Sequence, residues 1–405
     1  MSGVCFGEFF MSRQFLKLAP AFYDPRFVPP PDRGDWTIEI EGEGFARPAV
    51  AVDFAGTVVH EKPDPFASPA RQKRRQAEID LQVEQNKEAL ETAIFILSQS
   101  STGRDVLEQM TAEGYRIVFD DRRTGDRGAG GLCDPEDKLI ILRSHDNPEY
   151  LALLIGHEAV HAVQNTRHDL FPSTKHKPEV GIKLSFAIEA DAYAQQTQIA
   201  LELFYGDPAG PDDQLHMKGP LEQMRERFPD VVRAAEKVMN SADALENGSC
   251  VAAAFQAFYD NFHLRTFYED SHLEWADTYA PTLKKSFPWL QRHFNKDVDS
   301  GWILDRIQHK GLPYLRMHAP NLSFDDARHS GVSEESAEKI VQFYKDHLPK
   351  QSPPAALKRF GVHMKDAVNW VLGLTNHTHV IFKKGDDPTK PPLRAPPRRK
   401  WGFWE

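Results

Sequence analysis

The feature that most constrains the fold is the stretch LALLIGHEAVHAVQN, residues 151–165, where three polar residues interrupt an apolar run. Asn147, just before it, can cap a helix, and the proline that follows suits the first helical position. The apolar residues then recur with helical spacing, which predicts a buried helix. A buried helix that carries His157, Glu158 and His161 must provide partners for all three side chains.

These three residues follow the pattern H-E-x-x-H. An α-helix advances about 100° per residue, so histidines four positions apart share one face and can reach a single ion. The glutamate stands beside that face, where it can deprotonate a metal-bound water without binding the metal. The pattern therefore predicts a zinc site with His157 and His161 as ligands and Glu158 as general base. The alternative is a hydrogen-bonded polar cluster in the core.

A catalytic zinc site needs a third protein ligand and keeps a fourth position for water. Glu189, in FAIEADAYAQQ, is the acidic residue in the middle of the next long helix, which we expect to begin at residue 178. Two antiparallel helices joined by a loop can present both histidines and this glutamate to one ion. Glu189 is therefore the favoured third ligand, and His168 and His176, in the connection between the helices, are the alternatives.

Sequence patterns predict an α+β fold that is mostly helical, in four parts. Residues 1–85 form an N-terminal extension, and residues 86–206 form a compact core that holds both long helices. Residues 207–385 are expected to be helical, joined by turns that contain proline and glycine. Residues 386–405 form a proline-rich basic tail, which is either a flexible end or a docking segment for a partner.

Short elements are expected before the first long helix. Alternation of apolar and polar residues predicts a β-hairpin at 36–54, and the charged segment 68–85 is either a solvated helix or a linker. Residues 115–120 and 138–144 are rich in β-branched residues, which predicts two strands. The glycine-rich segment 121–137 between them is expected to be a turn region.

This order of strands, H-E-x-x-H helix and glutamate helix resembles the zincin metallopeptidases with a glutamate ligand, a gluzincin-like arrangement. It is similar to small bacterial metallopeptidase domains over about residues 86–205. The resemblance implies a minimal zincin core, a Zn²⁺ cofactor and a protein or peptide substrate. It also implies that the strand at 138–144 is the sheet edge along which an extended peptide lies.

The glutamate helix departs from the pattern of that group. There it often reads E-x-x-x-D, with the aspartate steadying a ligand histidine, whereas this chain has Tyr193 at that place and Asp191 two residues after Glu189. Asp191 lies roughly 200° around the helix from Glu189, so we do not expect it to face the same ion. Its role as a partner of the histidines is left open. For the oxyanion donor, Tyr193, Tyr259 and His263 are the available residue types.

Composition narrows the partners and the compartment. The chain has 49 basic and 59 acidic residues and a net charge of -10, so nucleic acid and anionic membranes are not expected partners. Three cysteines without C-x-x-C spacing suit a reducing compartment. The first residues lack a signal-peptide pattern, which predicts a cytoplasmic location and leaves specialised export as an effector open.

Two functions fit these observations. The first is a zinc-dependent metallopeptidase that hydrolyses peptide bonds through a zinc-bound water activated by Glu158. The second is a non-catalytic, metal-binding regulatory or protein-interaction module that uses the helical C-terminal region. A glutamate between the two histidines favours the first, because a purely structural metal site has no need of it.

Overall fold

The computed structural model describes most of the chain between residues 52 and 348. The described residues are 52, 54–57, 68–125, 129–145, 147–173, 175–207, 214, 216–239, 243–286, 294–325 and 332–348. The chain divides into two compact units, residues 1–352 and 353–405, and all described residues belong to the first. Most of the expected hairpin at 36–54 and the whole tail at 386–405 lie outside the described residues.

The fold is α+β and mostly helical, as predicted, with one small sheet of order β1-β2-β4-β3. Its strands are β1 (Phe54–Thr57), β2 (Arg116–Phe119), β3 (Gly131–Asp134) and β4 (Leu139–Leu142). β1, β2 and β4 are parallel, and β3 runs antiparallel to β4. The strands expected at 115–120 and 138–144 are confirmed as β2 and β4.

The edge of the sheet is not where the resemblance placed it. The strand at 138–144, β4, lies between β2 and β3, so β3 is the edge strand on that side. β3 falls in the segment expected to be a turn, since glycine has a low strand propensity. It forms because its residues are buried and because Asp134 closes the connection to β4. The Asp134 carboxylate accepts hydrogen bonds from the backbone N–H groups of Glu136 (3.0 Å) and Asp137 (3.2 Å).

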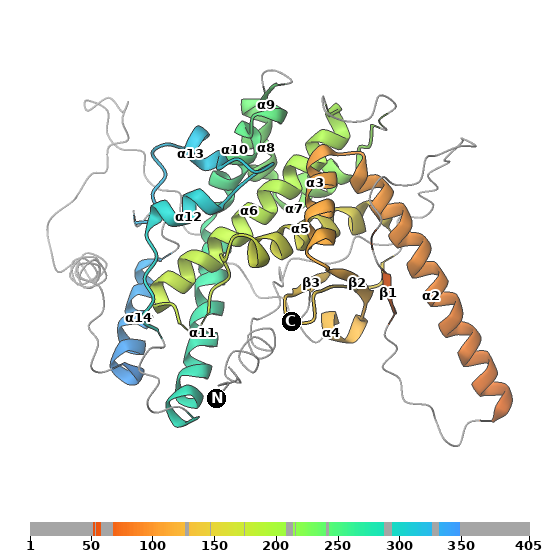
Figure 1. Ribbon diagram of the computed structural model, residues 1–405, viewed down its shortest axis with the longest axis horizontal. Coiled ribbons are helices and arrows are strands. Elements are labelled where there is room, and N and C mark those ends of the chain that lie inside the picture. Colours follow the sequence, from red (N-terminus) through yellow and green to blue (C-terminus); the bar gives the residue numbers. More distant parts are fainter. Residues whose placement is uncertain are drawn as a thin grey trace, which may run out of the picture. The chain divides into compact units, whose positions relative to one another are not determined.

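Five helices accompany this sheet. They are α2 (Pro69–Ser98), α3 (Ser101–Ala112), α4 (Asp121–Gly125), α5 (Pro148–Thr166) and α6 (Pro178–Tyr205). Of these, α2, α4 and α5 contact the strands of the sheet. α2 is continuous through residue 86, so the charged segment 68–85 is helical and the expected boundary after residue 85 falls inside this helix. α5 contacts α2, α3, α6, β3 and β4, and Figure 1 shows α6 running alongside it. α5 and α6 are the two long helices expected from the sequence.

The described residues after α6, up to residue 348, are mostly helical, as expected. They include α7 (Gly219–Arg227), α8 (Pro229–Val238), α9 (Asp243–Glu246), α10 (Ser249–Tyr259), α11 (Phe262–Ser286), α12 (Ser300–Arg306), α13 (Tyr314–His318) and α14 (Glu334–His347). Within the described range, no helix combines the length and apolar character needed to cross a membrane.

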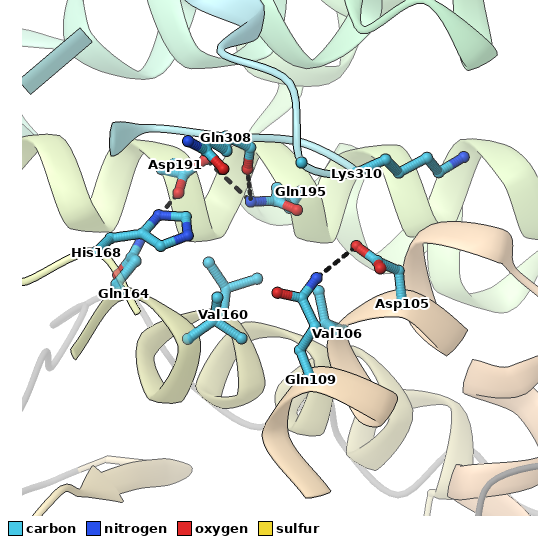
Figure 2. A pocket seen from close by; sticks show the side chains of 12 residues that line it. Asp105, Val106, Gln109, Val160, Gln164, His168, Asp191, Gln195, Gln308 and Lys310 are labelled. Carbon is cyan, nitrogen blue, oxygen red and sulfur yellow. Dashed lines mark hydrogen bonds between the residues drawn. The ribbon is translucent and has the colours of Figure 1, made fainter. Parts of the chain in front are cut away.

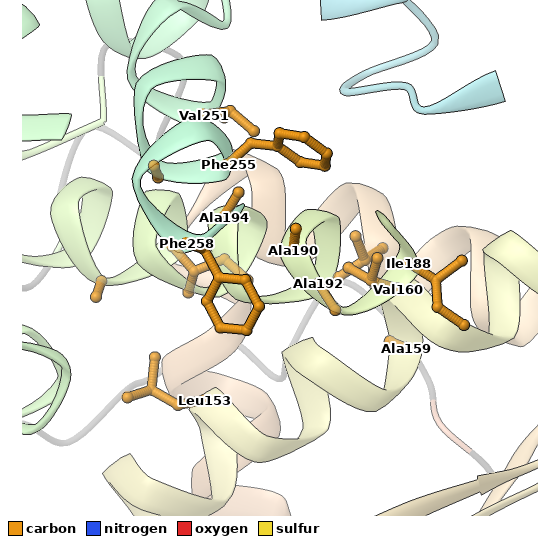
Figure 3. Packing of buried hydrophobic residues seen from close by; sticks show 14 of the residues in the cluster. Leu153, Ala159, Val160, Ile188, Ala190, Ala192, Ala194, Val251, Phe255 and Phe258 are labelled. Carbon is orange, nitrogen blue, oxygen red and sulfur yellow. The ribbon is translucent and has the colours of Figure 1, made fainter. Parts of the chain in front are cut away.

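The core is built around α6, which is buried along most of its length. Ala190 and Ala194 leave room for the rings of Phe255 and Phe258 on α10, as Figure 3 shows. Small side chains on one helix let the larger ones of its neighbour approach closely. Because α6 is covered on several sides, each polar residue along it must find its partner inside the protein.

Candidate metal centre

Local sequence fixes the position and register of α5. The Asn147 side chain accepts hydrogen bonds from the backbone N–H groups of Glu149 (2.9 Å) and Tyr150 (3.1 Å), as expected of a cap. Gly156 directly precedes the first histidine of the motif and faces α6. A Cβ atom at this position would lie 2.9 Å from Cδ1 of Ile199. This glycine lets the two helices approach at the level of the histidines.

The structure brings His157, His161 and Glu189 together from these two helices. The two Nε2 atoms of the histidines lie 3.1 Å apart. Glu189 Oε2 lies 3.5 Å from Nε2 of His157, and Oε1 lies 3.3 Å from Nε2 of His161. All three side chains are buried, and they form a group that could hold a metal ion.

The geometry of this group fits a small divalent cation. A tetrahedral ion with bonds of about 2.0 to 2.2 Å holds its ligand atoms roughly 3.3 to 3.6 Å apart, close to the observed separations. Two imidazole nitrogens and a carboxylate oxygen are also a donor set that zinc accepts. Moreover, Glu189 Oε1 is buried without a hydrogen-bond partner in the described structure. The residues present therefore fit a metal site.

The charges of the three groups are strongly coupled. Burial lowers the pKa of His157. For His161 burial acts the same way, but the charge of Glu189 outweighs it and raises the pKa to about 9. Burial raises the pKa of Glu189, but the charge of His161 and contacts with both histidines lower it to about 2. Glu189 is therefore an anion at neutral pH, as a metal ligand must be.

Glu158 lies between the triad and the edge strand β3. The backbone of Cys133 lies close enough to its carboxyl group to lower the pKa of that group, and a Cβ on Gly131 would lie 3.0 Å from its Cγ and Oε1 atoms. The absence of a side chain at Gly131 thus leaves the space that Glu158 occupies. Burial, opposed in part by the charge of His161, raises the pKa of Glu158 to about 7. This carboxyl group is suited to exchanging a proton near neutral pH.

Polar residues outside the motif hold the triad in place. His161 Nδ1 contacts Oε1 of Gln164 at 2.8 Å, and the Gln164 amide donates to Asp191 Oδ2 at 2.8 Å. Tyr268 on α11 donates to Glu189 Oε2 at 3.2 Å. Asp191 therefore reaches His161 through Gln164 and does not face the ion site itself. Sequence reasoning missed Gln164 and Tyr268, and a glutamine in a buried helix one turn after the motif was the available signal for the first.

The other candidates from the sequence lie apart from the triad. His168 Nδ1 donates to the backbone oxygen of Arg306, and His176 Nδ1 accepts from the backbone N–H of Ser173 at 3.0 Å. Neither loop histidine belongs to the group that could hold a metal.

The three candidate oxyanion donors are placed differently. The Tyr193 ring packs edge-on against His157, with the ring centroids 4.4 Å apart. Tyr259 packs in the core against Phe186, also with centroids 4.4 Å apart. The side chain of His263 lies outside the described residues. Among the two tyrosines, only Tyr193 touches the triad.

Residues 68–278, more than half of the chain, match a protein family described as "Putative metallopeptidase family (DUF6782)". The chain belongs to this family. The matched range of the metallopeptidase family begins at the cap of α2, ends within α11, and contains the triad, Glu158, Gln164 and Asp191. Membership indicates a metal-dependent peptidase. Searches of the curated proteins and of the solved structures gave no match.

Proposed function

We propose that the chain is a zinc-dependent metallopeptidase of the glutamate-ligand, zincin kind. His157, His161 and Glu189 would be the zinc ligands, and Glu158 the general base. The observation that carries the proposal is the convergence of three buried ligand atoms beside a fourth buried carboxyl group that is not part of the triad. A metal site that serves only the fold has no use for that fourth group.

Glu158 would handle the proton in the reaction. A bound zinc ion supplies Lewis acidity, which polarises a carbonyl and lowers the pKa of water from about 15.7 to about 7. Glu158 would accept the proton of the attacking water and then deliver it to the nitrogen of the leaving amine. Its position is held by β3 on one side and by the motif helix on the other.

The edge of β3 that faces away from β4 is the proposed place for an extended peptide. Gly130 accepts a hydrogen bond from the backbone N–H of Arg143 at 2.8 Å. Because pairing alternates along an antiparallel ladder, the backbone groups of Gly131 and Cys133 point away from β4. The influence of the Cys133 backbone on the pKa of Glu158 agrees with this direction. A substrate strand added there would pass directly beside the general base.

Glu158→Gln tests this function. We expect peptide hydrolysis to fall on the order of 10²- to 10⁴-fold, since the general base is lost, while zinc binding is retained. Glu149→Gln, on the same helix but in its first turn, is the matched control and should keep full activity. The readouts are bound zinc by mass spectrometry and new protein N-termini in cells that express each variant. Equal cleavage by zinc-loaded Glu158→Gln would exclude this mechanism.

A further inference from the structure

The hydrogen bonds around Gln164 fix the state of His161. The Gln164 amide nitrogen lies 2.9 Å from the backbone oxygen of Ile188 and 2.8 Å from Asp191 Oδ2, and both of these atoms accept hydrogen bonds. The NH₂ group must therefore point to them, and Oε1 must point to His161. Since Oε1 only accepts, His161 carries its hydrogen on Nδ1. In the neutral form of the ring, its Nε2 atom then presents a lone pair to the ion site.

Asp191 holds this orientation of Gln164 and is itself held from two sides. Its other oxygen, Oδ1, accepts hydrogen bonds from Tyr314 at 2.8 Å and from Gln195 at 3.1 Å. All of these side chains are buried. Gln195 lies on α6, one turn after Asp191, whereas Tyr314 begins α13 and lies beyond residue 278, where the family match ends.

The segment that carries Tyr314 is anchored to the core just before this residue. The Gln195 amide donates to the backbone oxygen of Gln308 at 3.2 Å, and Lys310 pairs with the buried Glu202 at 3.5 Å. Figure 2 shows the Gln195 amide hydrogen bonded to both Asp191 and Gln308, among the residues that line a small cavity. The cavity measures about 30 Å³, enough for one or two water molecules. Hydrogen bonds, more than apolar packing, thus fix Asp191 on this side.

We propose that Tyr314 is a positioning residue of the metal centre, which acts through Asp191 and Gln164 to hold His161 in the tautomer that can bind a metal. Without the Tyr314 hydroxyl, the Asp191 carboxylate loses a donor and can rotate. The Gln164 amide then keeps the backbone oxygen of Ile188 as its one fixed acceptor, and its NH₂ group turns towards His161 more readily. That orientation favours a hydrogen on Nε2 of His161, which blocks the ligand atom. The proposal rests on the role of His161 as a metal ligand.

Tyr314→Phe is the direct test, with Tyr344→Phe as the matched control. Tyr344, on α14, also donates to a buried carboxylate of α6, Glu179, at 3.1 and 3.2 Å, but away from the triad. We expect Tyr314→Phe to weaken zinc binding about 10-fold, as measured by competition with a chromogenic chelator, because partners of this kind typically contribute 10- to 100-fold. Tyr344→Phe should bind zinc as the wild type does. Equal affinities of the two variants would overturn the proposal.

A second background separates positioning from a general loss of stability. Gln164→Leu removes the hydrogen bonds that connect Asp191 to His161. Adding Tyr314→Phe to the Gln164→Leu variant should therefore weaken zinc binding no further. If Tyr314→Phe has the same effect in both backgrounds, the route through Gln164 is wrong. Should Tyr314→Phe not fold, Asp191→Asn takes its place, since the amide keeps the shape but cannot accept hydrogen bonds at both ends.

The tautomer itself can be read in the metal-free protein from the ¹⁵N chemical shifts of the His161 ring, at a pH above 9 where this ring is neutral. The Nδ1–H form should dominate in the wild type and in Tyr344→Phe, and the Nε2–H form should grow in Tyr314→Phe. An unchanged tautomer in Tyr314→Phe would contradict the proposal. This readout needs no zinc, so a wild type that fails to bind zinc would refute the proposed function and leave the tautomer test intact.

Discussion

Among the described residues, two pairs of buried histidines lie beside α6, and they differ in what surrounds them. In the triad, His157 and His161 face the carboxylate of Glu189. In the second pair, His272 on α11 contacts the Ser185 hydroxyl at 3.1 Å, and His176 Nε2 is buried without a hydrogen-bond partner in the described structure. Burial lowers the pKa of His176 to about 4 and that of His272 to about 3. In the triad, burial also lowers the pKa of His157, but the charge of Glu189 raises the pKa of His161 to about 9.

The difference shows what turns buried histidines into a candidate metal site. Burial alone makes an imidazole neutral and leaves it as a packing group. A buried carboxylate opposite two imidazoles creates instead a site with negative charge and converging lone pairs, which a divalent cation can satisfy. The deciding residue, Glu189, comes from the neighbouring helix and not from the five-residue motif.

Removing ligands should produce the largest difference between the two pairs. Zinc sites bind with about 10 to 16 kcal/mol over four ligands, so losing one costs roughly 3 kcal/mol, or about 100-fold in affinity. We expect losses of this size or more for His161→Ala and Glu189→Ala, measured by chelator competition. His168→Ala and His176→Ala should bind zinc as the wild type does.

The opposite result would assign the third metal ligand to a residue other than Glu189. If Glu189→Ala binds zinc normally while His168→Ala or His176→Ala loses it, the loop between α5 and α6 supplies the ligand. Glu189→Gln refines the comparison, because it keeps the shape and removes only the charge. It should bind zinc more weakly than the wild type but more strongly than Glu189→Ala.

Two glycines allow the proposed active site and the second histidine pair to be disturbed separately. A Cβ on Gly131 would lie 3.0 Å from Cγ and Oε1 of Glu158, so Gly131→Ala should displace the general base. A misplacement of about 1 Å can cost about 100-fold in rate, and we expect kcat to fall 10- to 100-fold with zinc binding retained.

Gly181→Ala is the counterpart in the second pair, where the new Cβ would lie 2.1 Å from Nε2 of His272. Overpacking a buried site typically costs about 1 to 3 kcal/mol, which exceeds the gain of about 1 kcal/mol from alanine in a helix. We expect a lower free energy of unfolding in urea and an unchanged kcat for the folded fraction. A loss of kcat in Gly181→Ala, or an unchanged kcat in Gly131→Ala, would contradict the assignment of catalysis to the first site and of a purely structural role to the second pair.

Local signals in the sequence were sufficient for the parts of the site that lie along one helix. The cap at Asn147, the spacing of the two histidines and the acidic residue in the middle of the next helix predicted the elements that the structure brings together. The angular argument for Asp191 also agrees with the structure, because this residue bonds Gln164 and not the ion site.

Contacts between distant segments could not be predicted in this way. β3 is held by pairing with β4 and by burial, both of which override the low strand propensity of glycine. Tyr314 meets Asp191 across 123 positions, and no local pattern marks that tyrosine as a partner. The second pair is similar: His176 was a candidate ligand from the sequence, but within the described structure neither it nor His272 belongs to a group that could hold a metal.

The smallest expected effect concerns the pH dependence that the second pair gives to stability. An unfolded histidine has a pKa of about 6.5, and the pKa of folded His272 is lowered to about 3. The unfolded chain therefore binds the additional proton first, and stability present above pH 6.5 is lost as the pH falls towards 3. At pH 5 the loss from His272 should be about 2 kcal/mol relative to pH 8.

His272→Gln removes this titration and keeps a polar group near Ser185. The variant should lose less stability than the wild type between pH 8 and pH 5, when both are unfolded with urea in the absence of zinc. Its zinc affinity at pH 8 should equal that of the wild type, because the second pair takes no part in the metal centre. If the two proteins instead lose stability in parallel, then His272 takes up its proton equally in the folded and unfolded states. Burial without a facing carboxylate would then not be what separates this pair from the triad.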